Sequence, residues 1–158
     1  GCSVTPLGAM RYIAVASPNF VARELPTGLN RANFAALPWL VFNRKDDMHS
    51  AWVSRAFGID APRLVPRSVP SSEAHARAAA MGWGLAVMPE QMAARWLASG
   101  ELLAVHPEVT IDVQLYWHQW SLRSEADTPP TLRAGTLDRI GRALAEGARL
   151  ALRPAESV

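Results

Sequence analysis

Short apolar runs and helical apolar spacings alternate along the chain as far as residue 105. The runs are rich in β-branched and aromatic side chains, which is typical of buried strands. They predict strands at residues 10–16, 39–42, 63–69, 85–88 and 102–105. Between the runs, apolar residues recur three and four positions apart, as on one face of an amphipathic helix. Strands that alternate with helices pair in parallel, so the pattern predicts an open α/β sheet.

The most informative unit follows the strand at 63–69. Ser71 and Ser72 come directly after it, and their hydroxyls can cap a helix by accepting from N–H groups of its first turn. Helical spacing predicts one apolar face for that helix: Ala74, Ala78 and Met81. Gly82 and Gly84 then end it, because a left-handed backbone conformation costs glycine little. Beside the carboxyl ends of such strands, helix N-termini face small ligands.

Proline, glycine and apolar spacing delimit the other helices of this region. Ser17 and Pro18 open a short helix that ends near Glu24, and a second helical segment is predicted at 31–37. Pro89 suits the first turn of a further helix. Two longer helices are predicted, one ending at Gly58 and one ending at Gly100. The apolar face of the first is Met48, Ala51, Trp52 and Ala56. That of the second is Met92, Ala93, Trp96 and Leu97.

The rest of the chain predicts one long strand and one long helix. Residues 111–120 alternate, with Ile111, Val113, Leu115 and Trp117 on one face and Gln114, Tyr116, His118 and Trp120 on the other. A helix is predicted from Thr131 to Leu152, with this apolar stripe: Leu137, Ile140, Leu144 and Ala148. Glycines at 135, 141 and 147 each cost a helix about 1 kcal/mol relative to alanine. That composition suits a helix that packs closely on a neighbour.

Composition indicates an ordinary soluble globular protein. Hydrophobic residues make up 49% and charged residues 19% of the chain. The net charge of +2 is too small to indicate nucleic-acid binding, and the arginines are not clustered. The single cysteine, Cys2, excludes an internal disulfide, which fits a reducing cytosol. No apolar run reaches membrane-spanning length.

The sequence carries no catalytic or metal-binding motif. The four histidines are scattered, without the H-E-x-x-H spacing of a zinc site. A phosphate-binding loop is absent, and so is the G-x-S-x-G turn of a nucleophile elbow. We therefore predict a binding protein rather than an enzyme, with no cofactor and no metal.

Three groups of residues have both a binding and a structural interpretation. Ser71 and Ser72 at a helix N-terminus suit a carboxylate, or they are plain helix caps. Asp46 and Asp47 suit a cationic amine or guanidinium, or they too begin a helix. Tyr116, with His118 and Trp120, lines a cleft or belongs to the core. Together the groups offer an anion site and a cation site, which is what an amino acid requires.

Four short blocks carry a family resemblance: VFNRKDDMH (41–49), VPSSEA (69–74), LASGEL (97–102) and LYWH (115–118). In this order and spacing they resemble the C-terminal half of LysR-type transcriptional regulators, specifically the ArgP/LysG group. The similarity extends from about Thr5 to Arg149. It implies a periplasmic-binding-protein-like (type II) α/β regulatory domain of two lobes with the effector between them.

The resemblance also implies how the chain is divided. Residues 1–9 would be a lead-in, 10–109 a complete second lobe, and 110–158 the return strand and C-terminal helix of a truncated first lobe. The chain is then expected to be a fragment, with a winged helix-turn-helix, a linker helix and most of the first lobe preceding Gly1.

Carried over position by position, the resemblance implies these effector-binding residues: Ser17, Lys45, Asp46, Asp47, Pro70, Ser71, Ser72 and Tyr116. Ser71 and Ser72 are assigned to the effector carboxylate, and Asp46 or Asp47 to its side-chain cation.

The function implied is the effector-sensing domain of a bacterial, cytoplasmic regulator that controls export of basic amino acids. Lysine or arginine would be the effector, DNA would be bound only through the missing N-terminal domain, and the full-length protein would be a homodimer or tetramer. One alternative is a lobe of a periplasmic-type solute-binding protein for an amino acid. Another is an α/β enzyme whose catalytic half lies upstream. In the upstream coding sequence, a helix-turn-helix would support the regulator and a signal peptide would support the solute-binding protein.

Overall fold

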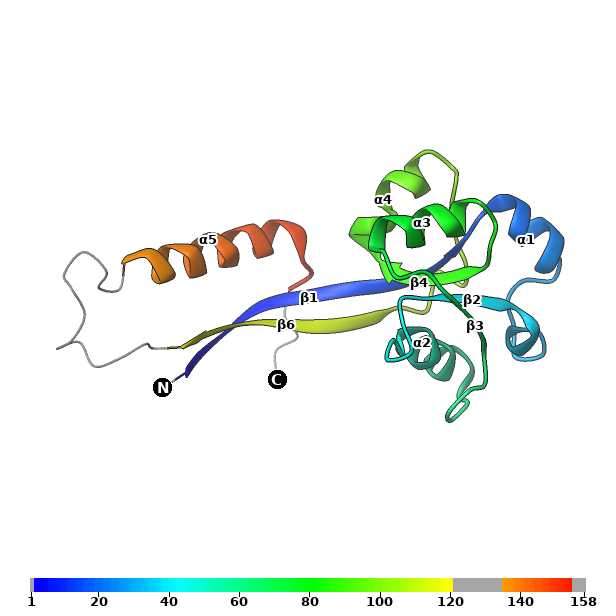
Figure 1. The fold of residues 1–158 in the computed structure, drawn as a ribbon, viewed down its shortest axis with the longest axis horizontal. Coiled ribbons are helices and arrows are strands. Elements are labelled where there is room, and N and C mark those ends of the chain that lie inside the picture. The colour runs from blue at the N-terminus through cyan, green and yellow to red at the C-terminus, as the bar shows by residue number, and fades with distance from the viewer. Residues whose placement is uncertain (1, 121–134, 155–158) are drawn as a thin grey trace. The chain divides into compact units, whose positions relative to one another are not determined.

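The computed structural model describes residues 2–120 and 135–154 (Figure 1). The chain divides into two units. The larger is Tyr12–Ile111, and the smaller combines residues 1–11 with 112–158. Strand β1 (Cys2–Ala16) begins in the smaller unit and ends in the larger one.

The larger unit is built on a mixed sheet. Its strands are the end of β1 and β2 (Pro38–Val41), β3 (Val65–Ser68), β4 (Leu85–Pro89) and β5 (Leu103–Ala104), in the order β3-β2-β4-β1-β5. Strand β2 pairs in parallel with both β3 and β4, which confirms the predicted parallel arrangement. Strand β1 is antiparallel to β4 and to β5, so the sheet is not parallel throughout.

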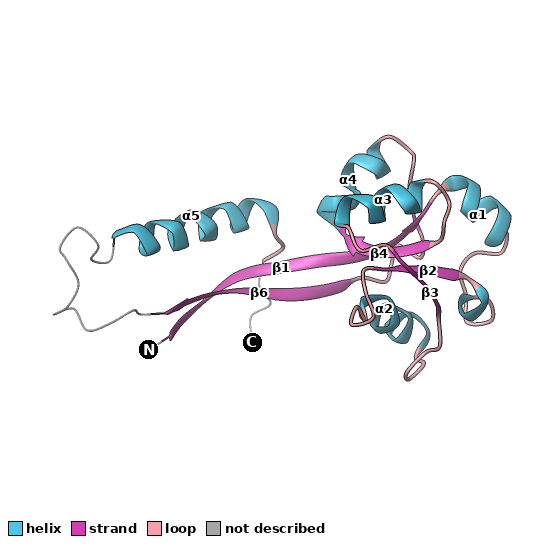
Figure 2. Cartoon of the chain, in the orientation of Figure 1, coloured by secondary structure: helices cyan, strands magenta, loops and turns pink. Residues whose placement is uncertain are grey.

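Helices cover both faces of this sheet. Helices α3 (Ser72–Ala80) and α4 (Glu90–Ala98) lie on one side of the strands and α2 (Met48–Phe57) on the other (Figure 2). Neighbouring strand residues alternate between two buried clusters: Val15, Leu40, Ala86 and Met88 join the side of α3 and α4, whereas Ala14, Ala16, Trp39, Leu85 and Val87 join the side of α2 and α1 (Pro18–Glu24). Period-two alternation of apolar residues on both faces is what a sheet covered on two sides requires.

The buried face of α3 differs from the predicted one. Met81 is 65% exposed, and the buried residues are His75, Ala76, Ala78 and Ala79. The alanine run offers little polar contrast, and Met81 lies at the C-cap, past the last turn of the helix. The predicted face of α2 also shifts, because Ala51 is exposed while His49 and Val53 are buried beside Trp52.

The two glycines after α3 have different roles. Gly82 has φ +80°, so it adopts the left-handed conformation predicted for the end of the helix. Gly84 does not adopt that conformation, so the prediction that it helps to end the helix in this way is wrong. A Cβ on Gly84 would lie 2.5 Å from the carbonyl oxygen of Pro38. Glycine is needed there because β4 begins in close contact with the start of β2.

Two predicted elements differ in extent. Residues 2–9, expected to be a lead-in, form the first part of β1, which pairs with β6. The helical segment predicted at 31–37 is only the 3-10 turn η1 (Phe34–Ala36).

The smaller unit contains the first part of β1, strand β6 (Ile111–Trp120) from Asp112 onward, and helix α5 (Gly135–Ala151), shown in Figure 1. The predicted strand at 111–120 is confirmed, and residues 131–134 of the predicted final helix lie outside the described residues. A Cβ on Gly141 would lie 3.2 Å from the indole nitrogen of Trp117, so this glycine does serve close packing. Gly147 has no such neighbour within 4 Å.

Candidate functional site

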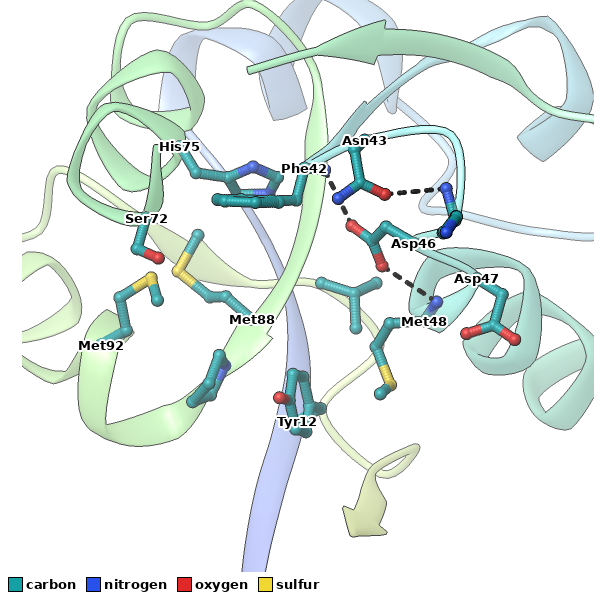
Figure 3. A pocket seen from close by; sticks show the side chains of 13 residues that line it. Tyr12, Phe42, Asn43, Asp46, Asp47, Met48, Ser72, His75, Met88 and Met92 are labelled. Atoms are coloured by element: carbon teal, nitrogen blue, oxygen red, sulfur yellow. Dashed lines mark hydrogen bonds between the residues drawn. The ribbon is translucent and has the colours of Figure 1, made fainter. Parts of the chain in front are cut away.

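A pocket of about 460 Å³ opens at the edge of the sheet where β2 and β4 end (Figure 3). Its lining residues all belong to the larger unit: Tyr12, Phe42, Asn43, Lys45, Asp46, Asp47, Met48, Ser72, His75, Val87, Met88, Pro89 and Met92. Phe42 and Asn43 follow β2, and Pro89 ends β4 opposite Tyr12 of the antiparallel β1. The pocket therefore lies where parallel strands end, as the βα pattern predicted.

An acidic loop forms one wall of the pocket. The carboxylate of Asp46 accepts hydrogen bonds from the main-chain N–H groups of Phe42, at 2.8 Å, and Met48, at 3.2 Å. Asn43 stiffens the same loop, because its Oδ1 accepts from the N–H of Lys45 at 2.7 Å. Asp47 occupies the N-cap position of α2, but its side chain makes no capping hydrogen bond. Asp47 is exposed and lines the pocket, so its uncapped carboxylate is available to a cation.

The N-terminus of α3 contributes to another wall. Ser71 is the N-cap residue, and its Oγ accepts from the N–H of Ala74 at 3.3 Å. Ser72 is the first helical residue, and its side chain lines the pocket (Figure 3). Of the two predicted serines, Ser71 is thus the helix cap and Ser72 the one that faces the cavity.

Between these polar groups the pocket is lined by flexible apolar side chains. Three methionines contribute, one from each of α2, β4 and α4: Met48, Met88 and Met92. Tyr12 and Phe42 add aromatic surface. Methionine adapts to ligands of different shape because it is unbranched and polarisable.

The negative charge of Asp46 affects three titratable side chains. Burial raises the pKa of Tyr12, and the charge of Asp46 raises it further. Burial lowers the pKa of His49 and of His75, and Asp46 opposes that shift in both. The two imidazoles are therefore neutral at pH 7 despite the nearby carboxylate.

Besides Ser71, three of the predicted binding residues do not line the pocket. Ser17 is 3% exposed, and its hydroxyl accepts from the N–H of Phe20 at 3.1 Å to cap α1. It lies beside Gly82 at the opposite edge of the sheet, because β1 runs antiparallel to β4. Pro70 is an exposed residue of the turn before α3 and does not line the pocket. Tyr116 lies on β6 in the smaller unit, 53% exposed, and its role in binding stays a prediction.

Sequence reasoning missed several lining residues, above all Tyr12, Phe42 and His75. The sequence predicts the first two as buried strand residues, but Tyr12 lies opposite the end of β4 and Phe42 directly follows β2. His75 is three residues after Ser72, and that spacing places both side chains on one side of α3. This helical spacing is the signal in the sequence that could have identified His75.

Among the described residues there is no group of three metal-binding side chains, and no described helix is long and apolar enough to cross a membrane.

An α/β sheet covered by helices on both faces, with a pocket of polar and apolar side chains at its strand ends, defines a small-molecule-binding domain. Residues 1–127 match the family model of the LysR substrate binding domain. The chain belongs to this family, so the prediction of a LysR-type, periplasmic-binding-protein-like fold is confirmed. The curated relatives that match the chain are transcriptional regulators, which agrees with the prediction that the chain is not an enzyme.

The named relatives are regulators of the predicted group. The chain is 37% identical over 154 residues to the HTH-type transcriptional regulator ArgP of Aeromonas salmonicida, a match that covers 98% of this chain and 48% of ArgP. The C-terminal domains of a LysR family protein from Agrobacterium tumefaciens superpose with a TM-score of 0.83 at 34% identity, covering 98% of this chain and 70% of that one. Full-length LysG from Corynebacterium glutamicum with bound effector Arg gives a TM-score of 0.76 at 32% identity, a match that covers 98% of this chain and 49% of LysG. The chain spans about half the length of the curated relatives it matches.

Proposed function

We propose that this chain is the effector-sensing domain of a bacterial transcriptional regulator of the ArgP/LysG kind, and that its pocket binds lysine or arginine. The observation that carries the proposal is the arrangement of the pocket. Acidic side chains of the 46–47 loop and the N-terminus of α3 both border it, with an apolar lining between them. The arginine bound to LysG of C. glutamicum, a protein of the same family and similar fold, supports this ligand class.

The proposed binding mode follows from the charge of each wall. The ligand carboxylate binds the hydroxyl of Ser72 and the first N–H groups of α3, where the helix dipole favours an anion. The cationic end of the ligand binds Asp47, because the carboxylate of Asp46 is already engaged by two main-chain N–H groups. The aliphatic stem lies on the methionine side chains. Lys45 completes the polar rim, while Ser71 and Pro70 set the turn that presents α3.

The regulatory action of the whole protein is part of the proposal. The larger unit would be the second lobe of the effector domain, and the smaller unit part of the first. DNA would be bound through a helix-turn-helix outside this chain, by a homodimer or tetramer in the cytoplasm, to control export of basic amino acids. An effector that binds one lobe arrangement more tightly shifts the protein toward that arrangement.

A role as a transport-associated solute-binding protein is less well supported. Its fold would be similar, but the named relatives are HTH-type transcriptional regulators.

Calorimetry with three ligands tests the proposal. L-Lysine and L-arginine should bind, whereas L-norleucine, which lacks the terminal cation, should bind at least about ten-fold more weakly. Asp47→Asn should remove most of that preference. Asp60→Asn is the matched control, because Asp60 is an exposed aspartate that does not line the pocket. Equal binding of norleucine and lysine, or no binding of either basic amino acid, would refute the assigned ligand class.

A further inference from the structure

His75 is a buried side chain in the wall of the pocket, and one of its nitrogens is unsatisfied. Only 6% of the residue is exposed, and it lines the cavity beside Ser72 (Figure 3). Its Nδ1 is covered from solvent and has no hydrogen-bond partner among the described residues. A buried polar atom without a partner is costly, so each such atom needs an explanation, such as an ordered water, an ion or a bound ligand.

The tautomer of His75 follows from its other contact. The imidazole hydrogen-bonds the backbone of Val69, and this contact raises its pKa, as a bond donated to a carbonyl does. Since Nδ1 has no partner, the donating nitrogen is Nε2. A neutral imidazole with its hydrogen on Nε2 leaves Nδ1 as a hydrogen-bond acceptor. The unsatisfied atom therefore requires a donor.

The position of His75 on α3 indicates which ligand group could supply that donor. Ser72 and His75 stand three residues apart on the same side of the helix, and both side chains line the pocket. In an α-amino acid the ammonium group is one carbon away from the carboxylate. A carboxylate held at Ser72 and the N-terminus of α3 would bring the ammonium group near the next turn of the same helix.

We propose that His75 is a specificity-determining residue whose Nδ1 accepts a hydrogen bond from the α-ammonium group of the bound amino acid. This inference rests on the proposed function and extends it, because it assigns the ligand group that distinguishes an α-amino acid from an ω-amino acid. Nδ1 is covered in this structure, so the ligand reaches it only after neighbouring side chains shift. A ligand without an α-ammonium group leaves Nδ1 unsatisfied and binds more weakly.

Two ligands and three variants of the intact protein test the proposal by calorimetry. L-Lysine and 6-aminohexanoate share the carboxylate, the stem and the terminal ammonium, and differ in the α-ammonium. The wild type should prefer lysine. His75→Leu should reduce the ratio of the two affinities by roughly ten- to hundred-fold, the range for a hydrogen bond to a charged group. His75→Asn, which keeps an acceptor near the position of Nδ1, should retain part of the preference.

His49→Leu is the matched control. His49 is also buried with an unpartnered Nδ1, but it lies on α2 and does not line the pocket. Its removal should leave the preference for lysine over 6-aminohexanoate unchanged. An unchanged ratio in His75→Leu, or an equal fall in both leucine variants, would overturn the role of His75 while leaving the proposed function intact. Failure of the wild type to bind lysine or arginine would instead overturn the proposed function.

A measurement on the wild type covers the case in which a leucine variant does not fold. The ¹⁵N resonance of Nδ1 of His75 should shift when lysine saturates the protein and should stay in place with saturating 6-aminohexanoate. The same shift with both ligands would contradict the proposal.

Discussion

The Oδ2 atom of Asp46 accepts a hydrogen bond from the main-chain N–H of Phe42 at 2.8 Å. The other carboxylate oxygen accepts from the N–H of Met48 at 3.2 Å. One side chain thus connects the residue after β2 to the first residue of α2 and fixes the acidic loop. Asp47, the next residue, makes no side-chain cap at all. Two adjacent aspartates that both line the pocket therefore differ, because the carboxylate of Asp46 is engaged within the loop and that of Asp47 caps no helix.

Substitution of these aspartates should separate stability from binding. Asp46→Asn replaces one acceptor oxygen with an amide donor, so it should lower the free energy of unfolding by about 1–3 kcal/mol. Asp47→Asn should change stability by less than about 0.5 kcal/mol and weaken lysine binding about ten-fold. Urea unfolding and calorimetry measure the two effects. A large stability loss in Asp47→Asn, with binding unchanged, would show that the roles are reversed.

Alanine substitution of the two serines at the start of α3 should likewise separate an effect on stability from an effect on binding. Ser71→Ala removes the cap at Ala74 and should cost about 1 kcal/mol of stability. Ser72→Ala leaves that cap in place and should mainly reduce affinity for the ligand carboxylate. Thermal unfolding with and without lysine distinguishes the outcomes. If the response to lysine survives intact in the double alanine variant, the proposed carboxylate site is wrong.

Gly84 and Gly147 should respond in opposite directions to alanine. At Gly84 the new Cβ would meet the Pro38 carbonyl oxygen at 2.5 Å, so the backbone has to move and about 1–3 kcal/mol of stability should be lost. At Gly147, inside α5, a new Cβ would have no neighbouring atom within 4 Å, so alanine should raise the free energy of unfolding by up to about 1 kcal/mol. Chemical denaturation of both variants measures these changes. A neutral Gly84→Ala would show that the start of β4 can move away from β2 at little cost.

The buried histidines predict a pH dependence of stability. Burial holds the pKa values of His49 and His75 below their usual 6.5 in the folded protein. Below pH 6.5 the unfolded chain binds protons at both imidazoles before the folded protein does, so stability falls as the pH drops toward the folded pKa values. Above about pH 7 both states carry neutral imidazoles, and these two groups cause no further change.

Urea unfolding between pH 5 and pH 8 measures this dependence. His49→Leu should flatten the slope by up to about one proton. A wild-type stability that rises as the pH falls from 7 to 5.5 would contradict the buried, neutral state of the two side chains.

Local signals in the sequence were sufficient for the main elements. Strands β2, β4 and β6, the stop of α2 at Gly58 and the end of α3 at Gly82 follow from apolar runs and from glycine in left-handed turns. The family blocks at 41–49 and 69–74 also marked both walls of the pocket, since the acidic loop and the start of α3 lie within them. These features depend on residues close together in the chain.

Only the tertiary structure decided which side chains share one site. The direction of β1 is set by its long-range pairing with β4, and that pairing places Ser17 at the far edge of the sheet while Tyr12 joins the pocket. Likewise the packing of α3 decided that the polar His75 faces inward and the apolar Met81 outward, against the usual preference of both side chains. Sequence spacing specifies helices, strands and turns through local backbone preferences. Which strand ends meet depends on contacts between residues far apart in the chain, and local backbone preferences do not determine those contacts.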